Sequence, residues 1–91
     1  METRTPIAKV KLFPNPARDQ VTVSFEATEA LDAPVMIFDA NGRQVSGQNV
    51  TTQPGKNQVE LNIADLPNGT YVVRIAAGSF VRAKQLVVVK N

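Results

Sequence analysis

Residues 70–89 read TYVVRIAAGSFVRAKQLVVV, two runs of alternating apolar and polar residues joined by Gly78 and Ser79. Because alternate side chains of a strand point to opposite faces, each run predicts a β-strand, and the glycine predicts a tight turn between them. A turn centred on Gly78 predicts the following opposite pairs: Tyr71 with Gln85, Val73 with Ala83, Ile75 with Val81, Arg74 with Arg82, and Val72 with Lys84. The sequence therefore predicts a hairpin with one apolar face and one face that carries basic residues.

Further runs of this kind precede the hairpin, at 9–13, 20–25, 35–39, 44–49 and 58–63. The run 35–39 is apolar on both faces and predicts a central strand, whereas 44–49 is polar, as edge strands often are. Segments rich in proline, glycine and asparagine separate the runs and predict turns.

The one candidate helix, residues 27–33, is followed by Pro34, which disfavours helical geometry in the residue before it. The segment is also short for a helix, so we expect a loop whose Leu31 packs inward. After Gln85 the alternation ends in four apolar residues, which predicts a bulge or burial on both faces. Six or seven short strands about ten residues apart predict an all-β fold, an antiparallel β-sandwich with Greek-key connections.

The composition is that of one small globular domain, with 91 residues of which 43% are hydrophobic and 20% charged. No run approaches the about 20 apolar residues of a membrane-spanning helix, and no secretory signal peptide opens the sequence. We therefore expect either a cytoplasmic protein or a piece of a longer precursor. Cysteine and histidine are absent, which excludes disulfides, thiolate zinc sites, cysteine nucleophiles and the commonest general base. We expect no enzyme and no cofactor.

The charge gives no indication of nucleic-acid binding. Ten basic and eight acidic residues leave a net charge of +2, and the basic residues are scattered singly. A nucleic-acid surface would need a basic block or stripe.

Two polar patterns have ordinary structural explanations. Asp39, Asn41 and Gly42 could begin a calcium loop, but the position that an EF-hand gives to a bidentate Glu holds a valine. Turn chemistry explains these residues instead. Asn49 and Asn68 fit the glycosylation sequon, but both lie where a turn needs asparagine.

The aromatic residues do not suggest a carbohydrate platform. Phe25 and Tyr71 occupy core positions of alternating runs, and Phe13 and Phe38 lie in apolar runs, which leaves only Phe80 exposed. One exposed ring is too few for such a platform.

Four segments together resemble the Por secretion tail family, the C-terminal domains recognised by the type IX secretion system of Bacteroidetes bacteria. Residues 12–17, LFPNPA, are similar to the opening YPNP signature of the family, with Phe13 in place of the commoner tyrosine. The other similar segments are 35–43, 66–74 and 84–90. The order and spacing of the segments agree with the family over residues 11–91.

The resemblance implies a type A sorting domain with a seven-stranded, immunoglobulin-like sandwich at the end of a larger secreted cargo. It implies passage through the periplasm to the outer membrane, then the cell surface or the medium. The implied partners are the outer-membrane type IX translocon, a shuttle protein and a sortase-like cysteine endopeptidase that removes the domain. On this interpretation residues 1–8 are a linker with an added start methionine, and residues 9–91 are the sorting domain.

We expect the recognition surface on the last strand and its basic neighbour: Arg74, Arg82, Lys84, Leu86, Val87, Val88, Val89 and Lys90. A solvated face is the simpler explanation of the basic residues. Motif residues at turns are expected to be structural: Pro14, Asn15, Pro16, Asn41, Gly42, Arg43, Leu66, Gly69 and Tyr71. The apolar last strand could also pair edge to edge in a homodimer. The alternative function is a non-catalytic sandwich module of the fibronectin type III or carbohydrate-binding type, which binds glycan or protein.

Overall fold

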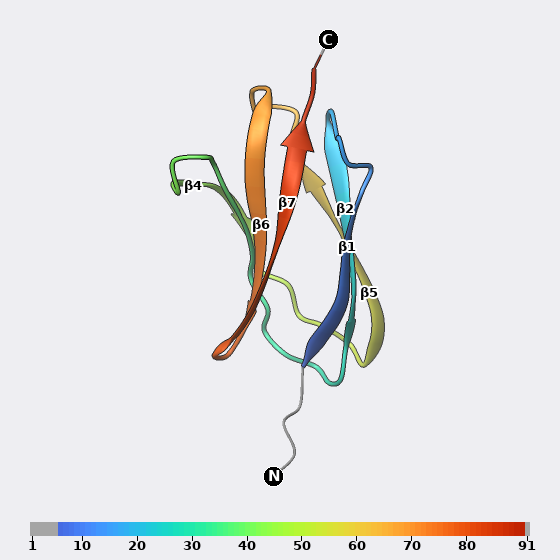
Figure 1. The fold of residues 1–91 in the computed structure, drawn as a ribbon. Coiled ribbons are helices and arrows are strands. Elements are labelled where there is room, and N and C mark those ends of the chain that lie inside the picture. Colours follow the sequence, from blue (N-terminus) through green and yellow to red (C-terminus); the bar gives the residue numbers. More distant parts are fainter. Residues whose placement is uncertain (1–5, 91) are drawn as a thin grey trace.

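The structure, a computed structural model, describes residues 6–90 and contains seven β-strands and no helix in that range (Figure 1). The strands are β1 Ile7–Phe13, β2 Gln20–Ala27, β3 Val35–Phe38, β4 Gln44–Gln48, β5 Gly55–Asn62, β6 Gly69–Ala77 and β7 Phe80–Val88. Every predicted run thus forms a strand. No helix long and apolar enough to cross a membrane occurs in the described part of the chain.

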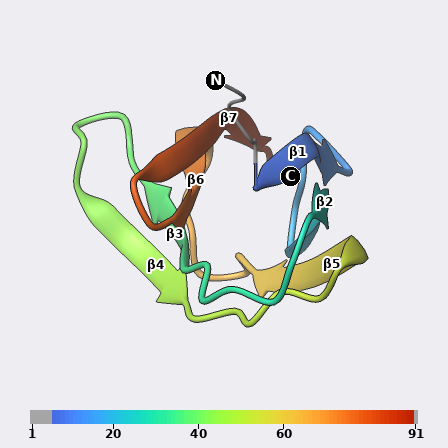
Figure 2. The ribbon, with the colours of Figure 1, turned by 90° about the horizontal axis from the view of Figure 1, so that it is seen from below.

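The strands form two sheets that face each other, as the view from below shows (Figure 2). One sheet has the order β1-β2-β5 and the other β4-β3-β6-β7, and all neighbouring strands are antiparallel. β2 pairs with β5 although β3 and β4 intervene in the sequence, so the chain crosses between the sheets after β2, β4 and β5. This is the Greek-key arrangement of immunoglobulin-like sandwiches. The predicted fold class is confirmed.

The core lies between the sheets and consists of the alternate side chains of their inner faces. Val21, Val23 and Phe25 of β2 are at most 1% exposed, and so are Val73 and Ile75 of β6. Burial of one such side chain stabilises a fold by about 1.5–3 kcal/mol. The period of two in the sequence therefore decides which side chains hold the sheets together.

The loop between β2 and β3 contains no helix, and Leu31 packs against the core, as predicted. A buried hydroxyl holds this loop. Thr52 Oγ1 donates to the Glu29 carbonyl at 2.7 Å and accepts from the Leu31 N–H at 2.9 Å. Both hydrogen-bonding functions of the hydroxyl are therefore satisfied inside the protein.

The predicted register of the β6–β7 hairpin is wrong by one residue. Ala77 pairs with Phe80, so the loop contains two residues and its centre lies between Gly78 and Ser79 rather than on Gly78. The observed opposite pairs are Tyr71 with Leu86, Val72 with Gln85, Val73 with Lys84, Arg74 with Ala83, Ile75 with Arg82, and Ala76 with Val81. The shift reverses the face of every β7 side chain relative to the prediction.

Two predictions about β1 are also wrong. The strand begins at Ile7, which is fully buried and pairs with Ala27, so the predicted linker over 1–8 does not hold for residues 7 and 8. Residues 1–5 lie outside the described part. Phe13 is 44% exposed because Leu12 packs on the core and the next side chain of a strand points to the opposite face.

Candidate functional site

The candidate site is the last strand, β7, to which the resemblance and the basic residues both point. β7 lies at the edge of the four-stranded sheet and pairs with β6 along its whole length. Within residues 6–90, its other edge has a hydrogen-bonded neighbour along only part of its length. We call residues 80–84 the open half of β7 and residues 85–88 the paired half.

The paired half has a second neighbour, residues 14–17, which we call the Asn15 segment. The Asn15 side chain donates to the Gln85 carbonyl oxygen and accepts from the Val87 N–H, both at 3.0 Å. The Ala17 N–H then donates to the Val87 carbonyl at 2.8 Å, and the Ala17 carbonyl accepts from the Val89 N–H at 2.9 Å. Because an asparagine amide offers the same donor and acceptor as a peptide group, the segment extends the sheet as a short parallel strand would.

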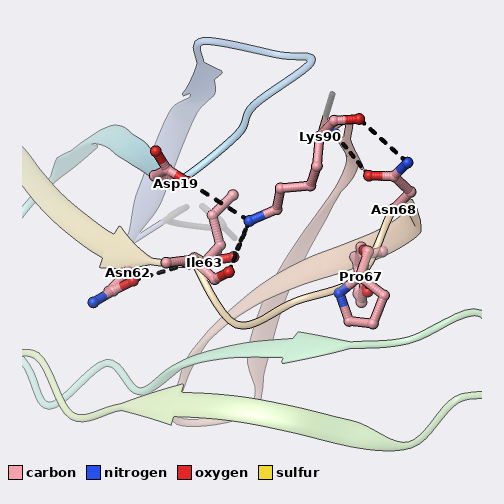
Figure 3. A network of polar contacts seen from close by, with 8 residues as sticks. Asp19, Asn62, Ile63, Pro67, Asn68 and Lys90 are labelled. Atoms are coloured by element: carbon pink, nitrogen blue, oxygen red, sulfur yellow. Dashed lines mark hydrogen bonds and ion pairs between the residues drawn. The ribbon is translucent and has the colours of Figure 1, made fainter.

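Lys90 fixes the chain just beyond β7 (Figure 3). Its Nζ donates to the carbonyl oxygens of Ile63 at 3.1 Å and Ala64 at 2.9 Å, and lies 3.8 Å from the Asp19 carboxylate. Its backbone N–H donates to the Asn68 side chain at 2.6 Å. The Asp19 carboxylate is largely exposed, so its ion pair contributes less than about 1 kcal/mol. The hydrogen bonds therefore decide where Lys90 lies.

Tyr71 supports the paired half from β6. It is buried, lies opposite Leu86, and donates its hydroxyl to the Pro67 carbonyl at 2.7 Å. A tyrosine bonded to the backbone four residues upstream closes the corner between β5 and β6, as the tyrosine corner of immunoglobulin-like domains does. Leu66 packs on the core within this corner, and Gly69 opens β6.

The turn between β3 and β4 contains the other motif residues. Asp39 Oδ1 accepts the backbone N–H groups of Asn41 and Arg43, each at 2.9 Å, and the Arg43 guanidinium lies 3.4 Å from Oδ2. The Arg43 N–H, with the Asn41 N–H and the guanidinium charge, lowers the pKa of Asp39 below its ordinary value. Gly42 has a φ of 84°, a conformation that favours glycine. In residues 6–90 no cluster of three or more acidic side chains could hold a metal ion.

Residues 81–84 of the open half are exposed on both faces, whereas Phe80 is half-buried and packs against the core, so the prediction that it is exposed is wrong. Val81 is 48% exposed, and Arg82, Ala83 and Lys84 are exposed as well. The Arg82 guanidinium lies 5.1 Å from the ring centre of Phe80. Within the described part of the chain, neither Arg82 nor Lys84 forms an ion pair. These two cations are available to an anionic group of a partner.

Arg74 lies on a different surface, the outer face of the four-stranded sheet. Its guanidinium is 5.0 Å from the ring centre of Phe38, within the about 6 Å of a cation–π contact. Phe38, Val72 and Arg74 line a shallow groove of about 350 Å³ that reaches the turn at Asp39. Because Arg74 lies opposite Ala83, it points away from the side to which Arg82 points, and the predicted single basic face does not form.

The structure separates the predicted recognition residues into three groups. Arg74, Arg82, Lys84 and Val89 are exposed, Val87 and Lys90 are half-buried, and Leu86 and Val88 are buried in the core. A partner could not reach Leu86 or Val88 unless the sandwich opened.

Sequence reasoning did not identify the partners of β7 that lie far away in the chain. The Asn15 side chain reaches a strand 70 residues later, and Asn68 pairs with Lys90 across 22 residues. The asparagine between two prolines was the available signal, but a turn explains the same residues. Local patterns cannot distinguish these two roles.

Comparison with known proteins shows the family of the chain and a similar fold among solved structures. Residues 11–90 match the family described as secretion system C-terminal sorting domain. Dimeric latent PorU from Porphyromonas gingivalis has a TM-score of 0.77 and 25% identity, over all of this chain and 10% of that chain. The sulfur carrier protein SoxY from Chlorobium limicola f thiosulfatophilum is 20% identical, over 96% of this chain and 82% of its own. Its TM-score of 0.45 carries no argument. No curated protein matches the chain.

Proposed function

The chain belongs to the secretion system C-terminal sorting domains, and from this we propose that it is read as a folded label at the end of a secreted cargo. It is a sorting signal of the type IX secretion system. The observation that carries the proposal is the match over residues 11–90, which spans β2 to β7 and the end of β1. The labelled cargo would lie on the N-terminal side of the domain. PorU, in which this fold occupies 10% of the chain, supports a domain that is part of a longer protein.

We propose a binding role without chemistry. The sequence has no histidine or cysteine, and the exposed cations Arg82 and Lys84 are suited to binding an anionic group. The partners would be the outer-membrane translocon, a shuttle protein and a sortase-like cysteine endopeptidase that removes the domain. The domain would act in the periplasm during passage to the cell surface or the medium.

For the recognition surface we propose the exposed side chains around the open half of β7. Arg82 and Lys84 have no charged partner within residues 6–90, and Arg74 adds a separate contact on the outer face. The motif residues around the paired half, among them Asn15 and Tyr71, would act by holding the strand in place. This division assigns recognition to exposed residues and folding to buried or bonded ones.

The test fuses residues 1–91 to the C-terminus of a periplasm-directed fluorescent protein in a type IX-competent bacterium. We expect the reporter at the surface or in the medium, and its loss from both in a translocon-deficient strain. The double variant Arg82→Ser, Lys84→Ser should reduce export. The matched control Lys11→Ser, Lys56→Ser removes two exposed lysines of the other sheet and should not. Retention of the folded wild-type fusion in the periplasm would contradict the proposal.

A further inference from the structure

The open half of β7 leaves backbone groups at the edge of the sheet without a partner. The N–H and C=O of Val87 both point away from β6, toward the Asn15 segment. Since the backbone groups of successive residues alternate between the two edges of a strand, those of Val81 and Ala83 point the same way. Within residues 6–90, neither residue has a hydrogen bond on that side. An edge of this kind is a template for another strand.

The same edge already accepts a strand-like segment in its other half. The Asn15 segment pairs with β7 in parallel, as the bridge between Ala17 and Val88 shows, and reaches no further back than Gln85. Figure 1 shows the β6–β7 turn well separated from the start of β1, and within residues 6–90 β6 is the only strand hydrogen-bonded to residues 80–84. The opposite edge, β4, is less regular, because its register with β3 shifts between Ile37 and Phe38.

We propose that the open half of β7 binds an extended segment of a protein partner by β-strand addition, and that this segment alternates acidic and small apolar residues. The inference rests on the proposed function, because it identifies what the sorting label would contact. Strand addition obtains affinity from backbone hydrogen bonds and specificity from alternate side chains.

The side chains of the open half determine the composition of the segment. Arg82 and Lys84 lie on one face of β7, and Val81 and Ala83 lie on the other. A strand placed beside them presents its own side chains alternately to these two faces. Acidic residues would then oppose the cations and small apolar residues would cover the valine and alanine, with each favourable pair adding to the backbone bonds.

The same charges disfavour a second copy of this chain as the occupant. An antiparallel copy paired through Ala83 would place Arg82 opposite Lys84 of the second copy. Like charges directly opposite each other destabilise a sheet. The homodimer through β7 that the apolar last strand suggested is therefore not the arrangement we propose.

The experiment attaches a Glu-Val-Glu-Val-Glu segment to the N-terminus of residues 1–91 through a Gly/Ser linker. Tethering raises its effective concentration to the order of millimolar. We expect amide exchange of Val81 and Ala83, followed by NMR, to slow by at least about tenfold relative to the untethered domain. A matched Lys-Val-Lys-Val-Lys fusion should give no slowing.

Two variants separate strand addition from other contacts. Ala83→Pro removes the outward N–H and is tolerable at a free edge, so it should abolish the slowing at Val81. The double variant Arg82→Glu, Lys84→Glu keeps the backbone groups of the edge. It should reverse the preference, so that the basic fusion slows amide exchange and the acidic fusion does not. If Ala83→Pro does not fold, this charge reversal still tests the proposal.

The proposal would be overturned if the acidic fusion folds but Val81 and Ala83 exchange their amides as fast as in the untethered domain. It would also be overturned if the acidic and the basic fusion slow this exchange equally. Slowing that depends on protein concentration would indicate a second copy and would also overturn it. The failure of the proposed function has a different signature, because the wild-type reporter fusion would then remain in the periplasm. If the wild-type reporter fusion and its Ala83→Pro variant are exported equally, strand addition is contradicted while the proposed sorting function stands.

Discussion

The two halves of β7 share one regular ladder with β6 but differ in everything else around them. Residues 85–88 have the Asn15 segment on their free edge and place Leu86 and Val88 in the core. In the described part of the chain, residues 80–84 have no hydrogen-bonded neighbour on that edge, and they expose two cations. One strand therefore combines a part whose side chains fill the core with a part whose side chains are mostly exposed. We attribute recognition to the second part.

The largest expected effect is in the core of the paired half. Leu86→Ala removes a fully buried side chain and should lower the free energy of unfolding by about 2–5 kcal/mol, whereas Lys84→Ala should change it by less than about 0.5 kcal/mol. Urea denaturation of both variants measures the difference. Leu86→Met, which conserves volume, is the control. Equal effects of Leu86→Ala and Lys84→Ala would remove the distinction between the halves.

A smaller effect is expected at the Asn15 segment. Asn15→Ala deletes two hydrogen bonds to the paired half, so the free energy of unfolding should fall by about 1–2 kcal/mol. Asn15→Asp keeps the acceptor for the Val87 N–H but turns a carboxylate oxygen toward the Gln85 carbonyl oxygen, so its free energy of unfolding should also be lower than that of the wild type. An Asn15→Ala variant as stable as the wild type would show that the segment does not hold β7.

Tyr71→Phe should lower the free energy of unfolding by about 1 kcal/mol, because it removes one hydrogen bond of the hydroxyl and keeps the buried ring. The Pro67 carbonyl then loses its partner. Thermal unfolding with the wild type as reference measures the loss. The amides of the open half should exchange as before, since the change lies at the opposite end of β6. Faster exchange at Ala83 would show that the halves are coupled.

The smallest effect concerns pH at the turn between β3 and β4, which serves as a reference site outside both halves. The pKa of Asp39 is lowered in the folded state, so its contribution to stability is present above the ordinary value of 3.8 and is lost as pH falls through the folded value. Asp39→Asn should therefore reduce the loss of stability below about pH 4. Urea midpoints at several acidic pH values provide the measurement. An unchanged pH profile would contradict the role of this carboxylate.

Local sequence patterns predicted the strands and the core well, because a period of two decides both which residues form a strand and which face is buried. Val21, Val23 and Phe25 illustrate this. The register of the last hairpin was wrong because glycine and serine allow loops whose centres differ by half a residue, and only the ladder itself decides between them.

The site was predicted less well, because its contacts connect distant parts of the chain. The pattern of Pro14, Asn15 and Pro16 indicated a turn, while the pairing of Asn15 with Gln85 and Val87 depends on how the sheets pack. The basic residues were placed on one face only because of the register error. The family resemblance pointed to the last strand but could not divide it into halves.

Amide hydrogen exchange along β7 in the native domain tests the division most directly. The outward amides of Val87 and Val89 donate to the Asn15 segment, so they should exchange only when the domain opens. The outward amides of Val81 and Ala83 should exchange far faster, near the rate of an unprotected strand edge. Equal protection of all four amides, or rapid exchange at Val87, would contradict the account.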